Sequence, residues 1–175
     1  GAPRAVARLH EAGVVVSVGH TDATADQVRV AADAGASKVT HVFNAQRGLR
    51  HREPGVPGAA FDDDRLHLGL IADLHHVAAP IVRLIFTAAA GRVVLVSDAV
   101  AAMGMPPGTY ALGGERAVVD SPGAPPHRLD GTLAGSDLTM DAAVAFAVAH
   151  LGVDLAEALR MASLYPAEFL DLAAT

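Results

Sequence analysis

Short runs of apolar, mostly β-branched residues recur along the chain and predict buried strands. They lie at residues 14–18, 38–43, 66–71 and 92–96. Runs this short and almost continuously apolar are typical of parallel strands that are covered on both faces. Apolar residues at helical spacing predict helices at residues 4–12, 24–34, 77–90, 137–151 and 155–164. Because strands and helices alternate, the pattern predicts right-handed βαβ units in an α/β fold.

Residues that start or stop helices flank several of these segments. Gly35 and Gly91 follow two predicted helices and are suited to the C-cap. Pro80 fits the first turn of the helix in which it lies. Asp154 is a predicted N-cap for the last helix, and Pro166 follows the end of that helix. These residues support the assignment of helices between and after the strands.

Residues 103–136 differ from the rest because they are rich in glycine and proline. They predict a loop that contains a hairpin, with residues 109–112 paired to residues 117–120. The remaining four βα units make about half of an eight-stranded barrel, which usually takes about 250 residues. The chain has 175 residues. We therefore interpret residues 1–175 as a single barrel segment of a larger protein.

Composition and charge narrow the classes of function. Apolar residues make up 51% and the mean hydropathy is +0.34, which argues against disorder. The net charge of −6 leaves no basic patch for a phosphate backbone, so we expect no nucleic-acid partner. No uncharged apolar stretch reaches the roughly 18 residues of a membrane span. The residues after Gly1 lack a signal-peptide layout, so we expect a cytoplasmic protein without a membrane partner.

Polar residues follow the predicted strands at the points where these end. They are His20, His41, Asp73 and Asp98. The carboxyl ends of parallel strands share one rim, where catalytic groups are built. Neutral imidazole suits Zn²⁺, Fe²⁺ or Co²⁺, and a catalytic metal needs about three protein ligands with one open position. His20 and His41 would supply two of these ligands, and the absence of cysteine removes thiolate ligands.

Each of these residues also has a purely structural interpretation. A histidine at a strand end is usually a hydrogen-bonded structural residue. Asp98 could cap the segment that follows it, and we favour a role for Asp73 in orienting a loop. The histidines away from the rim are interpreted as structural or solvated; they are His10, His67, His127 and His150.

Two charged clusters are open to more than one interpretation. The three adjacent carboxylates at residues 62–64 are expected to form a solvated turn before a strand, not a magnesium site. Arg47, Arg50 and Arg52 follow the second strand. They form either a solvated loop or a docking site for an anionic substrate.

Seven short segments occur in an order and at spacings that are characteristic of a known family. They are Gly19–Thr24, Thr40–Ala45, Arg52–Gly55, Gly69–Asp73 with His76–Val77, Leu95–Ala99, Leu133–Ser136 and Met161–Pro166. Any one segment is a weak signal, but seven in order are strong. Together they resemble the N-acetylglucosamine-6-phosphate deacetylases of the amidohydrolase superfamily, and the resemblance covers nearly all of the chain.

The resemblance implies a fold, a reaction and a catalytic centre. The fold is a (β/α)₈ TIM barrel with a small β-sandwich domain, of which this chain matches about the last four βα units. The reaction is metal-dependent hydrolysis of the N-acetyl group of N-acetylglucosamine 6-phosphate, which gives glucosamine 6-phosphate and acetate. By position, His20 and His41 match two metal-binding histidines and Asp98 matches the catalytic aspartate. The cofactor is a divalent cation, with zinc or iron expected.

The resemblance also implies residues that bind the phosphosugar substrate. Arg52 and His76 match residues that bind the sugar phosphate. In the family this arginine reaches across from the partner subunit, so a homodimer is expected. Asn44 and Ala45 match a turn that lines the substrate site, and Leu133 matches a residue near the acetyl group.

Departures from the family pattern keep two alternatives open. The family's metal-binding glutamate would lie upstream of Gly1, and neither Glu11 nor Glu53 matches it. The β-sandwich is also unmatched, and Gln46 stands where a methionine is usual. The alternatives are an amidohydrolase that acts on a different amide, and a non-catalytic barrel fragment without a complete metal site.

Overall fold

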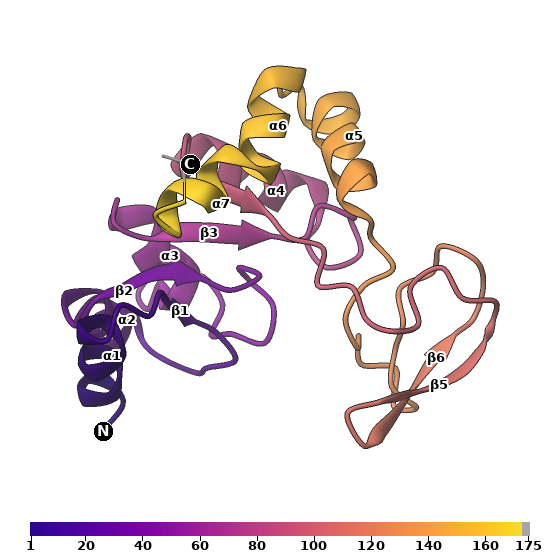
Figure 1. Ribbon diagram of the computed structural model, residues 1–175, viewed down its shortest axis with the longest axis horizontal. Helices are drawn as coiled ribbons and strands as arrows, with labels where there is room; N and C mark the ends of the chain where they lie inside the picture. Colours follow the sequence, from indigo (N-terminus) through magenta and orange to yellow (C-terminus); the bar gives the residue numbers. More distant parts are fainter. Residues whose placement is uncertain (173–175) are drawn as a thin grey trace.

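Four parallel strands form one sheet in the order in which they occur along the chain (Figure 1). The computed structural model describes residues 1–172, so residues 173–175 of the predicted segment lie outside the described part. The strands are β1 (Val16–Val18), β2 (Ala36–Val39), β3 (His67–Leu70) and β4 (Val93–Leu95). Each neighbouring pair is parallel, which confirms the predicted α/β class with βαβ units.

Helices connect the strands and complete the chain. They are α1 (Ala2–Glu11), α2 (Ala25–Asp33), α3 (Gly55–Asp62), α4 (Ala79–Ala88), α5 (Met140–Leu151), α6 (Leu155–Ala162) and α7 (Leu164–Phe169). Helix α2 begins with a capping box in which Thr24 and Gln27 satisfy each other's backbone N–H groups. The predicted N-cap of α6 is confirmed, because the Asp154 carboxylate accepts a hydrogen bond of 2.8 Å from the Glu157 N–H.

One apolar core lies between the sheet and its helices. From the sheet it includes Val39, Leu68, Leu70 and Leu95, all essentially inaccessible to solvent. The helices contribute Val28, Val56, Val82 and Ile85, which are also fully buried. Burial of each such side chain contributes about 1.5–3 kcal/mol, so the core fixes the positions of the strand ends. None of the helices within residues 1–172 is long and apolar enough to cross a membrane.

Residues 103–136, which we call the arm, contain a two-stranded hairpin and stand off from this body (Figure 1). Its strands are β5 (Gly108–Leu112) and β6 (Glu115–Val119), which pair in antiparallel fashion and confirm the predicted hairpin. The arm returns to the body beside its own starting point. There the Asp137 carboxylate accepts a hydrogen bond of 2.6 Å from the Gly104 N–H.

Several predicted boundaries were wrong. The first strand begins at Val16 because Val14 and Val15 are largely exposed. The second ends at Val39, four residues earlier than predicted, because the backbone turns to positive φ at His41. Helix α3 had not been given bounds, and α7 contains Pro166 in its first turn.

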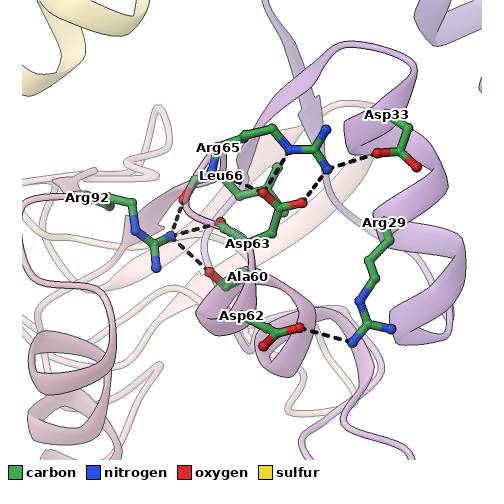
Figure 2. Close-up of polar contacts among 8 residues, drawn as sticks. All are labelled: Arg29, Asp33, Ala60, Asp62, Asp63, Arg65, Leu66 and Arg92. Atoms are coloured by element: carbon green, nitrogen blue, oxygen red, sulfur yellow. Dashed lines mark hydrogen bonds and ion pairs between the residues drawn. The ribbon is translucent and has the colours of Figure 1, made fainter.

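Arginines and aspartates form a network at the amino ends of β3 and β4 (Figure 2). Arg65 binds Asp33 at 2.9 Å and Asp63 at 2.6 Å, and Arg29 binds Asp62 at 3.3 Å. Hydrogen bonds from Arg65 lower the pKa of Asp63. The acidic run at residues 62–64 forms the predicted turn before β3, with Asp62 and Asp64 exposed to solvent, and each of its carboxylates also contacts an arginine.

Arg92 caps the carboxyl end of α3 within this network. Its guanidinium donates to the carbonyl oxygens of Ala60 at 2.9 Å and Leu66 at 2.6 Å, and also to those of Phe61 and Asp63. The last carbonyls of a helix lack partners within the helix and carry partial negative charge. Arg92 satisfies these carbonyls and joins α3 to the start of β4.

Candidate active site

The loops at the carboxyl ends of the strands adopt an unusual backbone conformation. Seven non-glycine residues of the described chain have positive φ, and six of them lie just beyond one of the four strands. They are His20 after β1, His41, Phe43 and Ala45 after β2, Leu74 after β3 and Asp98 after β4. Such residues cost of order 1–3 kcal/mol each and cluster at functional sites. The rim is thus where the fold tolerates strain.

His20 and His41 meet at this rim. Their Nε2 atoms lie 3.0 Å apart, and the rings are edge to face with centroids 4.8 Å apart. His41 is buried, with 6% of its surface exposed, whereas His20 is exposed. The Nδ1 atom of His41 is buried and has no hydrogen-bond partner within residues 1–172. The two predicted metal ligands are therefore brought together from strands β1 and β2.

Hydrogen bonds join the two loops that carry these histidines. The Thr21 N–H donates to the Ala45 carbonyl at 3.0 Å, and the Arg47 N–H donates to the Thr21 carbonyl at 3.1 Å. The Arg47 guanidinium also binds both carboxylate oxygens of Asp22, at 2.6 and 3.0 Å, and this contact lowers the pKa of Asp22. Arg47 is thus paired with Asp22 at the surface of the protein, and a role of this arginine cluster in docking an anion stays a prediction.

The separation of the imidazoles can be tested against a metal. Two nitrogens that each lie about 2.0–2.1 Å from a tetrahedral zinc ion are roughly 3.3 Å apart. The observed 3.0 Å between the Nε2 atoms is close to this value, so His20 and His41 fit a shared divalent ion. Within residues 1–172 no group of three or more histidine, aspartate or glutamate side chains is arranged to hold a metal. The chain thus offers two ligands of the expected three.

Asp98 lies three residues beyond β4, with a φ of 50° and an exposed side chain. Its carboxylate makes no hydrogen bond or ion pair with any residue from 1 to 172. Asp98 lies at the same end of the sheet as the histidines. A free carboxylate at a strand end can accept a proton, which a carboxylate held by an arginine does less readily.

Asp73 and His76 form a pair beyond β3. His76 Nδ1 lies 2.6 Å from the Asp73 carboxylate, and both side chains are almost entirely buried. Asp73 also accepts the backbone N–H groups of His75 and His76, each at 2.9 Å. Burial raises the pKa of Asp73, but the hydrogen bonds from His76 and His75 outweigh it, so the pKa is lowered overall. The interpretation of Asp73 as a residue that orients a loop is confirmed.

The other residues predicted to bind substrate differ from one another in exposure and in hydrogen bonding. Arg52 is exposed and contacts the His51 ring at 2.9 Å. The Asn44 amide faces the carbonyl oxygens of His41 and Val42, so it holds the turn closed. Ala45 is exposed at positive φ, and Leu133 is 38% exposed beside the arm.

Three residues that shape this rim were not singled out as functional from the sequence. Gln46 donates to the Thr40 carbonyl at 2.5 Å and accepts from the Phe43 N–H at 3.3 Å, so it braces the loop after β2. Glu53 accepts the N–H groups of Ala25 and Gly55, which lower its pKa, and so it caps a helix. Ser136, which is fully buried, contacts the backbone around Asp98. The contacts of Glu53 with Ala25 and of Ser136 with Ser97 join distant segments and leave no local signal in the sequence.

The other histidines have structural surroundings, as expected. His67 stacks near Phe169 with ring centroids 5.6 Å apart, and His150 stacks on Phe146 at 4.7 Å. His127 contacts the Asp120 carboxylate at 2.8 Å.

Comparisons with known proteins identify the family. The chain is 46% identical over 172 residues to an N-acetylgalactosamine-6-phosphate deacetylase of Escherichia coli O157:H7. It is also 48% identical over 132 residues to a protein of Escherichia coli strain K12 that is provisionally named N-acetylgalactosamine-6-phosphate deacetylase, and this alignment covers 75% of the chain and 78% of that relative. The chain belongs to the N-acetylglucosamine- and N-acetylgalactosamine-6-phosphate deacetylase family.

A solved structure shows how much of a deacetylase the chain represents. The chain superimposes with a TM-score of 0.93 and 42% identity on an aspartate-to-alanine variant of the N-acetyl-D-glucosamine-6-phosphate deacetylase of Mycobacterium smegmatis, in complex with N-acetyl-D-glucosamine-6-phosphate. The match covers 98% of this chain and 46% of that one. The alignment with the Escherichia coli O157:H7 deacetylase likewise covers 98% of this chain and 45% of that relative. The chain therefore spans about half the length of such relatives. No protein-family model matches the chain.

Proposed function

We propose that the complete protein hydrolyses the N-acetyl group of N-acetylglucosamine 6-phosphate, giving glucosamine 6-phosphate and acetate. Residues 1–175 would supply about the last four βα units of its (β/α)₈ barrel. The observation that carries the proposal is the 3.0 Å approach of His20 Nε2 to His41 Nε2 at the strand ends of a deacetylase-family chain. The rim of a parallel barrel is where such enzymes build their sites.

His20 and His41 would hold a divalent cation, zinc or iron, together with a ligand from outside residues 1–172. When bound, such an ion supplies polarisation of the acetyl carbonyl and makes a water molecule more acidic. The loop contacts described above join the two segments that carry these histidines, and so would help to keep the imidazoles close when the ion binds.

Asp98 would move the proton that amide hydrolysis requires. It would accept a proton from the attacking water as the C–O bond forms. It would then give this proton to the amine nitrogen as the C–N bond breaks, which makes the amine a better leaving group. General acid–base catalysis of this kind contributes typically about 10²–10⁴-fold. The unengaged carboxylate of Asp98 suits both steps.

Arg52 and His76 would bind the 6-phosphate. The arginine fork donates two parallel hydrogen bonds and keeps its charge, which suits a phosphate. Because Asp73 occupies His76 Nδ1, the imidazole has Nε2 left to offer. Asn44, Ala45 and Leu133 would line the sugar and acetyl positions.

In the family that the sequence resembles, the phosphate-binding arginine comes from the partner subunit, so a homodimer is proposed. The charged substrate does not cross a bilayer unaided, which favours a cytoplasmic reaction.

N-Acetylgalactosamine 6-phosphate is a second candidate substrate. Two relatives, at 46% and 48% identity, carry the galactosamine name, and the solved structure at 42% identity carries the glucosamine name. The two sugars differ only in the configuration of one ring hydroxyl, so the same metal and carboxylate would serve both.

The test is to purify the complete protein in zinc, measure bound metal, and assay acetate release from both phosphosugars and from unphosphorylated N-acetylglucosamine. We expect bound zinc to depend on His20 and His41, and turnover to depend on the phosphate. The variant Arg52→Ala should raise KM for phosphorylated substrates about 10-fold or more while leaving the unphosphorylated sugar unaffected. Arg83→Ala, at an exposed residue of α4, is the control.

Three results would contradict the proposal. If His20→Ala and His41→Ala bind as much zinc as the wild type, these histidines do not form the metal site. If zinc binds as expected but the protein hydrolyses a different amide and neither phosphosugar, the alternative amidohydrolase is favoured. A chain without metal or turnover would be the non-catalytic barrel fragment.

A further inference from the structure

Ser136 is one of two buried polar residues in the described chain, and the other is His41 of the candidate site. Ser136 has no exposed surface, although it lies where the arm rejoins the body. Buried polar groups are almost always hydrogen-bonded, and the partners of such a group show what it holds in place. The partners of Ser136 surround Asp98.

Ser136 contacts the chain on both sides of Asp98. Its Oγ donates to the Ser97 carbonyl, and its backbone N–H donates to the Asp98 carbonyl at 2.9 Å. Its own carbonyl accepts the Val100 N–H at 3.4 Å. The two segments form an isolated parallel bridge between Ala99 and Ser136. Asp98 is thus held by a segment 38 positions later in the chain.

Ser136 itself is fixed on its other side. Its Oγ accepts the Leu138 N–H at 3.0 Å, so the hydroxyl both donates and accepts. The preceding residue must be glycine, because Gly135 has a φ of 80° and an added Cβ would lie 2.4 Å from Val100 Cγ1 and 2.9 Å from the Asp98 carbonyl oxygen. The close approach of the arm root to Asp98 is therefore built into the sequence around Ser136.

Asp98 needs such support because its conformation is strained. It lies beyond β4 with a φ of 50°, and its carboxylate makes no hydrogen bond or ion pair within residues 1–172. Strained residues persist only where the surrounding structure determines their conformation. The hydrogen bonds of Ser136 are the contacts that do so here.

We propose that Ser136 is a positioning residue that clamps the backbone of Asp98 and so directs its carboxylate into the rim. This inference rests on the proposed role of Asp98 in deacetylation. It also gives the arm a function, since the segment that leaves the body after Asp98 returns to lock it.

The experiment compares Ser136→Ala with Ser163→Ala in the complete protein loaded with zinc. Ser163 is a matched control because its Oγ also donates to a carbonyl, that of Leu159, but far along the chain from Asp98. We expect Ser136→Ala to lower kcat for N-acetylglucosamine 6-phosphate at least 10-fold with KM changed less than twofold. Ser163→Ala should change neither constant.

A second readout does not depend on turnover. The ¹³Cα and ¹³Cβ chemical shifts of Asp98 report its backbone conformation. They should move away from left-handed values in Ser136→Ala and stay unchanged in Ser163→Ala. The variant Ser136→Thr, which keeps the hydroxyl, should retain the wild-type shifts and most of the wild-type kcat.

The outcomes separate this inference from the proposed function. If the complete wild-type protein is inactive, the deacetylase proposal fails, and the Asp98 shifts still decide whether Ser136 holds the backbone. A folded Ser136→Ala with wild-type Asp98 shifts and kcat would overturn the clamp. If Ser136→Ala does not fold, the test rests on Ser136→Thr. A folded Ser136→Thr whose Asp98 ¹³C chemical shifts differ from the wild-type values would then overturn the clamp.

Discussion

The two ends of the parallel sheet differ in how many of their polar groups are paired, although the Arg47–Asp22 and His76–Asp73 pairs also lie at the carboxyl ends. At the amino ends, arginines and aspartates pair closely, and Arg92 satisfies the carbonyls at the end of α3 (Figure 2). At the carboxyl ends, the backbone is strained at six residues and the Asp98 carboxylate has no partner within residues 1–172. His20 and His41 face each other with no carboxylate between them.

This difference separates stability from chemistry. Paired charges at the amino ends stabilise the turns that lead into β3 and β4, and they leave no group free to react. Unpaired or strained groups at the carboxyl ends cost stability, but they can bind a ligand or move a proton. In parallel barrels the chemistry lies at the carboxyl ends, which matches this division. Variants at the two ends should therefore affect different measurements.

The largest expected effect is on activity and comes from Asp98→Asn. Asparagine keeps the size of the side chain and tolerates positive φ, but it cannot accept the proton from water. Turnover of N-acetylglucosamine 6-phosphate should fall about 10²–10⁴-fold, with zinc content unchanged. Steady-state kinetics and metal analysis of the complete purified protein measure both.

Urea unfolding provides the control for that variant. The free energy of unfolding of Asp98→Asn should equal or exceed that of the wild type, because no contact of the carboxylate is lost. More than a few per cent of wild-type turnover would exclude Asp98 as the acid–base residue.

The next effect is on stability and comes from Arg92→Met. Methionine keeps much of the apolar stem but leaves the carbonyls of Ala60 and Leu66 without their charged donor. Hydrogen bonds to charged groups contribute about 1.5–3 kcal/mol, so the free energy of unfolding should fall by that amount. Arg83→Met, at an exposed residue of α4, should have little effect on urea unfolding.

Activity measured in the same variant sharpens the comparison. Arg92→Met should retain wild-type kcat under conditions where it is folded, because Arg92 lies at the opposite end of β4 from Asp98. A large loss of kcat in the folded variant would show that the two ends are coupled, contrary to the division above.

Much of the fold could be predicted because burial leaves a strong pattern. All four strands were found in order. Strands β3 and β4 are buried almost throughout and are nearly continuous apolar runs, whereas β1 and β2 are only partly buried. Helix α3 was harder, because Gly55, Pro57 and Gly58 hide a helix that is stabilised by burial and not by its propensity. The end of β2 was misplaced because positive φ at His41 is not encoded in hydrophobicity.

The candidate site was predictable to a similar degree and for a similar reason. Placement of His20 and His41 after neighbouring strands was enough to predict that they meet. Their role and that of Asp98 came from the resemblance of short motifs. The contact of Arg47 with Asp22 and that of Ser136 with the Asp98 backbone could not be predicted, since they join segments about 25 and 38 positions apart. No local pattern reports such pairs.

The smallest expected effect concerns Asp73, which lies at the carboxyl-end rim but is bonded as closely as the residues at the amino ends. Its pKa is lowered in the folded protein, so folding favours the ionised carboxylate. That contribution is complete above the ordinary pKa near 3.9 and is lost as the pH falls through the lower folded value. Asp73→Asn should therefore reduce the free energy of unfolding by about 1 kcal/mol at pH 7, and the difference from the wild type should shrink toward pH 3. Urea unfolding of both proteins at several pH values measures this difference. If the difference in free energy of unfolding between the two proteins widened on acidification, the protonated carboxyl would be the stabilising form. Asp73 would then resemble the strained groups of the rim and not the paired groups at the amino ends.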